Sequence, residues 1–355
     1  MRTLTKKKLL VALTALTALT ALTALTALTS LTALTALTSF AFARWVLVSA
    51  GRLNATTLQS IDGPFLCVRT TCADDESRKR PPTHSDVSYG AHMRNVIDIW
   101  LAPGDGPRPL LVYVHGGGWF TGDKSQKMPD YVPYLDKGIS FAAINYRLAP
   151  ENPLPAPVHD AARSLQFIRS KAVEWSIDPE RIALIGPSAG ACTSLWLLLH
   201  DDLADSNASD AVLRESTRVC AAAVIVPQTS IDPKVIEEWL GPNVLQHSMV
   251  PFAVGEKTIA DAIRNDHRHR EVFVEFSPIN HVDSSDPPLF MECNAEMDLP
   301  SRDAGHGIHH PVFGVNLKKR SDEVGHECHL FIPGFSKSEK YSSVNDFLMN
   351  KLLAK

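Results

Sequence analysis

Residues 186–190, Gly186-Pro187-Ser188-Ala189-Gly190, decide the fold of this chain because they place a serine between two glycines. The apolar stretch 181–185 before them predicts a short buried strand, and residues 191–200 after them predict a helix. A serine on a tight turn from a strand into a helix is typical of a nucleophile elbow, in which only glycine tolerates the close backbone approach. The pattern therefore predicts nucleophilic acyl transfer with Ser188 as the nucleophile.

A second glycine-rich stretch supplies donors for the transition state of such a reaction. Residues 115–118 read His-Gly-Gly-Gly and follow the apolar stretch 110–114, which predicts another strand. Acyl transfer builds negative charge on the carbonyl oxygen, and glycines leave backbone N–H groups uncovered to receive that charge. We expect the N–H groups of Gly117, Gly118 and Ala189 to form this oxyanion hole.

Together the two motifs resemble the α/β-hydrolase superfamily, in particular the hormone-sensitive-lipase-like and feruloyl-esterase-like carboxylesterases. Further matching stretches are Asn145-Tyr146-Arg147-Leu148-Ala149-Pro150-Glu151, Asp160-Ala161 and Ile177-Asp178-Pro179-Glu180-Arg181-Ile182. The resemblance covers about residues 85–350 and departs from the family at Pro187 and Ala191. It implies a serine carboxylesterase acting on small acyl esters, including carbohydrate esters, with Trp119 and Phe120 either lining the acyl pocket or packing the loop.

The remaining catalytic groups are expected after Ser188, since a serine hydroxyl needs a base and the base needs an orienting acid. The resemblance places the acid after the strand predicted at 288–293, where Asp298 stands, with Glu296 and Asp303 as weaker candidates. The family's histidine follows the last predicted strand, but residues 330–355 contain no histidine. Ordinary triad hydrolysis is therefore in question.

Three explanations of the missing histidine stay open. The base comes from residues 305–311, which contain His306, His309 and His310, although the last two could equally cap a helix starting at Pro311. Alternatively, the enzyme retains weak activity through its oxyanion hole and a water molecule. In the third explanation the chain is an exported pseudoenzyme that binds a ligand or partner without cleaving it.

Composition bounds the class of protein and its partners. The chain has 355 residues, of which 45% are hydrophobic and 21% charged, as in globular proteins, and its formal net charge of −4 implies no nucleic-acid partner. Strands alternating with predicted helices indicate a mostly parallel sheet with helices on both faces. The expected chemistry needs no metal or organic cofactor, and no Cys/His spacing resembles a zinc site. Because the motifs predict acyl transfer, the expected partner is a small-molecule ester.

The N-terminal region differs from the rest of the chain. Lysines 6–8 precede the uncharged stretch 9–43, which is built largely of Leu-Thr-Ala repeats and ends in Ala-Phe-Ala. This pattern predicts a secretory signal peptide in residues 1–43. Its apolar length would also span a bilayer, so an uncleaved membrane anchor is the alternative. We therefore expect an exported protein, either secreted or periplasmic, or one attached to a membrane through this segment alone.

Two further regions complete the predicted organisation. Residues 44–84 predict a linker, in which Cys67 and Cys72 could form a disulfide after export. Residues 85–355 predict the α/β-hydrolase domain. Within it, residues 229–286 interrupt the alternation of strands and helices, which indicates a cap-like insertion.

Overall fold

The computed structural model describes residues 80–354, which lie in the second of the chain's two units, Ala73–Lys355. The predicted signal or anchor, Cys67, Cys72 and nearly all of the predicted linker lie outside the described residues. Within residues 80–354, no helix is long and apolar enough to cross a membrane.

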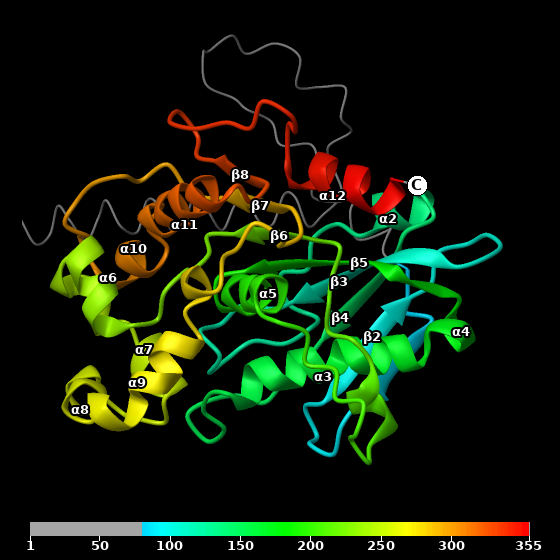
Figure 1. Cartoon of the computed structure of the whole chain (residues 1–355), viewed down its shortest axis with the longest axis horizontal. Helices are drawn as coiled ribbons and strands as arrows, with labels where there is room; N and C mark the ends of the chain where they lie inside the picture. The colour runs from blue at the N-terminus through cyan, green and yellow to red at the C-terminus, as the bar shows by residue number, and fades with distance from the viewer. Residues whose placement is uncertain (1–79, 355) are drawn as a thin grey trace, which may run out of the picture. The chain divides into compact units, whose positions relative to one another are not determined.

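An eight-stranded sheet forms the centre of the described domain (Figure 1). Its strands are β1 (His84–Ser88), β2 (Val96–Trp100), β3 (Arg108–Val114), β4 (Ser140–Ile144), β5 (Ile177–Pro187), β6 (Ala221–Ile225), β7 (Leu289–Glu292) and β8 (Cys328–Phe331). They are ordered β1-β2-β4-β3-β5-β6-β7-β8. The β1–β2 and β2–β4 pairs are antiparallel and all other pairs are parallel, so the mostly parallel sheet is confirmed.

Helices connect most of the parallel strands. The α-helices are α2 (Val132–Asp136), α3 (Ala156–Ser170), α4 (Ala172–Trp175), α5 (Ala189–Leu199), α6 (Pro233–Leu240), α7 (Met249–Ala253), α8 (Ile259–Arg264), α9 (Asp266–Glu275), α10 (Ala304–Ile308), α11 (Val312–Val324) and α12 (Val344–Leu353). Short 3-10 helices are η2 (Ala211–Arg214), η3 (Pro242–Gln246) and η4 (Pro278–Asn280). The predicted interruption at 229–286 corresponds to the helical segment between β6 and β7, which holds α6 to α9.

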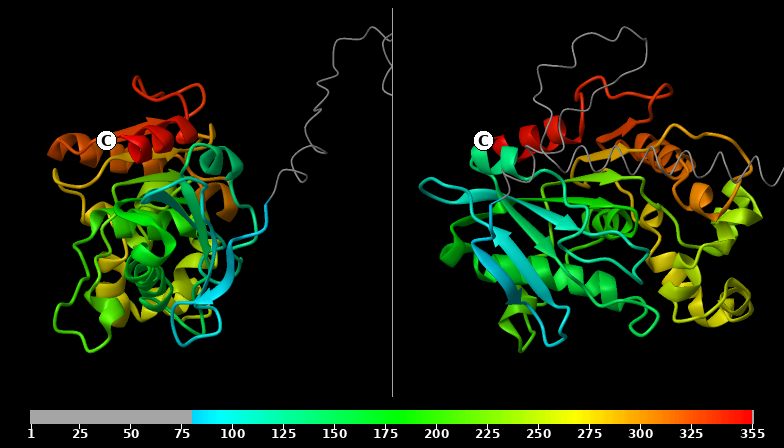
Figure 2. Two further views of the ribbon diagram at one scale, coloured as in Figure 1. Left: turned by 90° about the vertical axis from the view of Figure 1, so that its right-hand side faces the viewer. Right: turned by 180° about the vertical axis from the view of Figure 1, so that it is seen from behind.

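The two faces of the sheet bury separate apolar clusters, because side chains alternate along each strand. On β5, Ile182 and Leu184 face the cluster that contains α3, α5 and α11. Ala183 and Ile185 face the opposite cluster, which contains α2 and α12. Figure 1 shows α2 and α12 along one face and α3 and α5 along the other, and Figure 2 shows β1 and β2, in blue and cyan, at one edge of the sheet.

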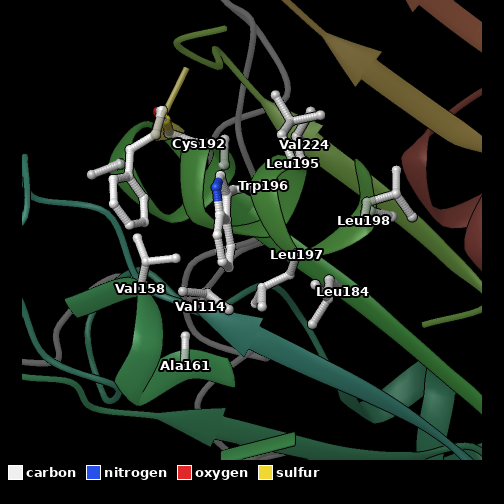
Figure 3. Close-up of a cluster of buried hydrophobic side chains, with 14 of the residues drawn as sticks. Val114, Val158, Ala161, Leu184, Cys192, Leu195, Trp196, Leu197, Leu198 and Val224 are labelled. Atoms are coloured by element: carbon white, nitrogen blue, oxygen red, sulfur yellow. The ribbon is translucent and has the colours of Figure 1, made fainter. Parts of the chain in front are cut away.

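Helix α5 is apolar on all sides, and all of its residues are buried. A helix with this composition is stable only when it is surrounded by other elements. Figure 3 shows its side chains between helix α3 and the sheet, with labels on Cys192, Leu195, Trp196, Leu197, Leu198, Val158, Ala161, Val114, Leu184 and Val224. Because α5 begins directly after Ser188, this packing fixes the position of the serine.

One element is shorter than the sequence suggests. Residues 125–137 predict a helix, but only Val132–Asp136 is helical. Lys127 adopts a left-handed backbone conformation with φ +52°. Pro129 disfavours helical geometry at the residue before it, so no helix passes through this stretch. The segment instead runs along the edge of the pocket described below.

Candidate active site

The turn at Ser188 has the geometry of a nucleophile elbow. Ser188 lies between β5 and α5 with φ +52° and ψ −124°, and its N–H donates to the carbonyl oxygen of Ile225 at 2.9 Å. A Cβ atom on Gly190 would come within 2.1 Å of the Val114 carbonyl oxygen, and one on Gly186 would meet the Gly190 backbone at 2.6 Å. Both positions therefore require glycine. Ser188 itself is partly exposed at the turn.

His309 is the histidine that reaches Ser188. Its Nε2 atom lies 3.0 Å from the Ser188 hydroxyl oxygen, within hydrogen-bond distance. His309 directly follows α10 and lies three residues before the start of α11, on the connection between β7 and β8. Of the three histidines considered in the sequence, the structure thus brings His309 to the serine.

The other two histidines of that cluster have structural partners. The buried His306 accepts the Arg302 N–H on Nδ1 at 3.1 Å, and its Nε2 lies 3.2 Å from the Glu296 carbonyl oxygen. The buried His310 accepts the Val312 N–H on Nδ1 at 3.1 Å. These contacts order the loop around α10, so His306 and His310 support the segment that carries His309.

The structure does not place the predicted acid beside the base. The Asp298 side chain is 83% exposed, and its closest charged neighbour is Arg302 at 3.9 Å. Across residues 80–354, no Asp or Glu carboxylate lies within 4.0 Å of a ring nitrogen of His309. The reason is the loop geometry: residues 295–300 are largely exposed, so Asp298 points away from the protein rather than toward His309.

The two weaker acid candidates are also engaged elsewhere. Glu296 forms an ion pair with Arg302 at 2.6 Å. Asp303 caps helix α10, where its Oδ1 accepts the N–H of His306 at 2.8 Å. Neither carboxylate is therefore available to orient His309.

Backbone and amide groups hold the His309 segment instead. Gln228, which is fully buried, donates from Nε2 to the carbonyl oxygen of Ile308 at 2.5 Å. Asn294, two residues beyond β7, donates from Nδ2 to the His309 carbonyl oxygen at 2.9 Å. The Gly305 carbonyl interacts with the His309 ring. Because Nε2 faces Ser188, Nδ1–H is the group from which this carbonyl can accept.

The surroundings of His309 favour the neutral imidazole. Burial lowers the pKa of His309, the Gly305 carbonyl partly offsets this by raising it, and the positive charge of Lys127 lowers it further. At neutral pH the ring is therefore unprotonated, the form that can accept the Ser188 proton.

His115 supports the glycine-rich loop that follows β3. The His115 ring is buried and stacks on Tyr146 with ring centroids 4.2 Å apart, and its Nδ1 lies 2.7 Å from the Gly116 carbonyl oxygen. Tyr146 donates its hydroxyl to the His115 carbonyl oxygen at 2.7 Å. Burial lowers the pKa of His115 to about 4, so this ring is a neutral structural support.

The two glycines above His115 present free donors. Gly117 and Gly118 have φ +107° and φ +62°, and a Cβ atom on Gly117 would approach the Thr121 carbonyl oxygen to 2.2 Å. No acceptor in the described part of the chain takes their N–H groups. Ala189 opens helix α5, so its N–H also lacks an intrahelical partner. The three predicted oxyanion-hole residues therefore flank the turn that carries Ser188.

A pocket of about 630 Å³ opens beside Ser188. It is lined by Tyr113, His115, Gly116, Gly117, Gly118, Phe120, Thr121, Gly122, Asp123, Gln126, Lys127, Pro187, Ser188, Val226, His247, Asn294 and His309. Phe120 lines it, but Trp119 is fully buried and donates from Nε1 to Thr193 Oγ1 at 2.9 Å. His247 comes from the segment between β6 and β7, so this insertion contributes a wall of the pocket.

Comparison with protein families matches residues 97–298 to BD-FAE, more than half of the chain. The chain belongs to the BD-FAE family. The matched region contains Ser188 and the glycine-rich loop, and it ends before His309.

Curated relatives of this BD-FAE protein are named as esterases. One is the "Probable carboxylic ester hydrolase LipM" of Mycobacterium tuberculosis, 30% identical over 212 residues, which are 58% of this chain and 46% of the relative. Another is the "Probable isoprenylcysteine alpha-carbonyl methylesterase ICMEL1" of Oryza sativa subsp. japonica, 35% identical over 127 residues, 35% of this chain and 30% of the relative. The chain thus spans less than half the length of these relatives.

Solved structures confirm the predicted α/β-hydrolase fold. A "Truncated form of carbohydrate esterase from gut microbiota" superposes with a TM-score of 0.60 at 19% identity, covering 78% of this chain and 100% of that one. An "acetyl ester-xyloside bifunctional hydrolase from Caldicellulosiruptor lactoaceticus" superposes with a TM-score of 0.53 at 21% identity, covering 67% of this chain and 76% of that one.

Proposed function

We propose that this BD-FAE protein is a serine carboxylesterase that hydrolyses small acyl esters, with Ser188 as nucleophile and His309 as general base. The observation that carries the proposal is the 3.0 Å contact between the Ser188 hydroxyl and His309 Nε2 inside a pocket that also holds the glycine-rich loop. The names of the curated relatives support the reaction class.

The proposed reaction follows from this geometry. Ser188 Oγ attacks the ester carbonyl carbon while its proton passes to His309 Nε2. The carbonyl oxygen becomes an oxyanion that accepts hydrogen bonds from the N–H groups of Gly117, Gly118 and Ala189. The protonated imidazole then donates to the leaving alkoxide, and a water molecule, activated by the same histidine, releases the acid from Ser188.

Within residues 80–354 no carboxylate neighbours the His309 ring, which has a consequence for the rate. In a full triad the acid fixes the tautomer of the histidine and stabilises the imidazolium. Here the Gly305 carbonyl raises the pKa of His309, but it contributes only a dipole, not a full negative charge. We therefore propose a Ser188–His309 pair that works with a slower chemical step than a Ser-His-Asp triad.

The substrate class and cellular location are proposals as well. The pocket volume exceeds what an acetyl group requires, and the carbohydrate esterase among the structural neighbours makes sugar esters reasonable test substrates. We propose export of the protein on the basis of the basic and apolar N-terminal segment.

Turnover and covalent labelling test the proposed function. The full chain should hydrolyse 4-nitrophenyl acetate and become labelled by a fluorophosphonate, whereas Ser188→Ala should do neither. His309→Gln should be folded and nearly inactive, because Ser188 then lacks a base. A folded wild-type protein that neither turns over the ester nor takes the label would instead be the non-catalytic binding protein considered in the sequence analysis.

A further inference from the structure

The pocket beside Ser188 is lined by few residues that carry a fixed charge. Among its lining residues, Lys127 is the one Lys or Arg and Asp123 the one Asp or Glu. Burial lowers the pKa of His247 and of His309, so both imidazoles are neutral at pH 7. The fixed charges of the pocket are thus one carboxylate and one ammonium.

The carboxylate of Asp123 is already occupied by the protein. Its Oδ1 accepts the N–H and the hydroxyl of Ser125 at 3.0 and 2.7 Å, and its Oδ2 accepts Nδ2 of Asn145 at 2.7 Å. Burial alone would raise the pKa of Asp123, but these hydrogen bonds together with the charge of Lys124 hold it at about 2. Asp123 therefore stays ionised, and its oxygens stabilise the loop rather than bind a ligand.

The ammonium of Lys127, in contrast, has no carboxylate within 4.0 Å in residues 80–354. The backbone at this point is nevertheless firmly held, since the Tyr113 hydroxyl donates to the carbonyl oxygens of Gln126 and Lys127 at 3.0 and 3.1 Å. Lys127 also adopts φ +52°, a conformation that costs free energy for a residue with a side chain. A lysine held in this way at the carboxyl end of β3 lies where ligands bind in open α/β sheets.

We propose that Lys127 makes this site selective for esters that carry a negative charge, such as a carboxylate several bonds from the scissile ester. The inference deepens the proposed esterase function and rests on it. The pocket holds about 630 Å³, enough for an acyl group together with an anionic extension. An exposed, unpaired ammonium attracts such a group without the cost of first breaking an ion pair.

A pair of matched esters tests the charge preference. Mono-4-nitrophenyl adipate carries a free carboxylate, and methyl 4-nitrophenyl adipate is its neutral counterpart; release of 4-nitrophenolate reports the same scissile bond in both. We expect kcat/KM of the full chain to be about fivefold higher for the anionic ester, and the preference to shrink as ionic strength rises.

Substitution of Lys127 assigns the preference to this residue. Because Lys127 also lowers the pKa of His309, the comparison is the ratio of the two kcat/KM values measured at one pH above the inflection. In Lys127→Met this ratio should fall about fivefold, so that the preference is lost, and in Lys127→Glu it should reverse. Lys137→Met is the matched control, because Lys137 is exposed and does not line the pocket, and it should keep the preference.

The outcomes separate this inference from the function on which it rests. Equal rates of wild type on both esters, or equal losses on both in Lys127→Met, would overturn the role of Lys127 while leaving an active esterase. A wild-type protein inactive on both esters and unlabelled by a fluorophosphonate would overturn the proposed function and this inference together.

Discussion

Replacement of Asp298 by Asn distinguishes the catalytic site expected from the sequence from the Ser188–His309 pair proposed from the structure. An acid that orients the catalytic histidine is worth about 10⁴ in kcat, because its amide counterpart holds the wrong tautomer and cannot stabilise the imidazolium. The structure places the Asp298 carboxylate at 83% exposure and more than 4.0 Å from the His309 ring nitrogens. A carboxylate this exposed is solvated, so water screens its charge from His309.

The magnitude of that influence follows from Coulomb's law. Two unit charges 4 Å apart in water interact by ~1 kcal/mol, and dissolved salt reduces this further. A free energy of that size corresponds to about fivefold in rate at most. We therefore expect Asp298→Asn to retain kcat/KM within about fivefold of wild type.

Steady-state hydrolysis of 4-nitrophenyl acetate measures this effect, with thermal unfolding to show that the variant is folded. Asp105→Asn is the matched control, because Asp105 is an exposed carboxylate in the turn before β3, at the end of the sheet opposite Ser188. A thousandfold or greater loss in a folded Asp298→Asn protein, with Asp105→Asn unchanged, would show that the loop moves to bring Asp298 to His309 and would refute the carbonyl-oriented pair.

Three further expectations concern the base, its support and the elbow. Because burial lowers the pKa of His309, kcat/KM should rise with pH through an inflection below 6.5. Removal of the positive charge in Lys127→Met should move the inflection upward, and a pH–rate profile measures both. Gln228→Leu removes the donor to the Ile308 carbonyl, so the free energy of unfolding measured with denaturant should fall by ~1–3 kcal/mol. The folded variant should also have a lower kcat. An unchanged free energy of unfolding would contradict the stabilisation of this segment by Gln228. Gly190→Ala forces a Cβ atom to 2.1 Å from a carbonyl oxygen and should destabilise the protein by ~1–3 kcal/mol with loss of fluorophosphonate labelling; a wild-type melting temperature would argue against the tight elbow.

The features that were predictable from the sequence are those with local signals. The elbow at Ser188 and the loop at Gly117 and Gly118 combine glycine positions with an apolar strand before them, and both motifs are visible within a dozen residues. The strands of the parallel sheet are short apolar stretches that alternate with helical ones. Strand β1, with little apolar character and mostly exposed residues, gives no such signal and was not predicted.

The support of the base could not be read from the sequence, because it depends on contacts between distant segments. Gln228 meets the Ile308 carbonyl across 80 residues of chain, and a single buried glutamine has no periodicity that would reveal it. The three-histidine cluster narrowed the base to His306, His309 or His310, but only the packing of α10 decides which ring faces Ser188. One usable signal was the position of Asn294, two residues beyond β7 and near the place where the family resemblance puts the acid; its amide holds the His309 carbonyl.

His309 lies after β7 and Ser188 before it, so the chain can be cut between the two residues for protein engineering. The exposed loop 295–300 separates a part that holds the proposed nucleophile and oxyanion hole from a part that holds the proposed base. Under the proposed mechanism, two polypeptides cut at this loop would each be inert, and ester hydrolysis would report their reassembly. Strand β8 and helix α12 carry none of the proposed catalytic groups, so fusions after α12 would leave the chemistry of such a reporter untouched.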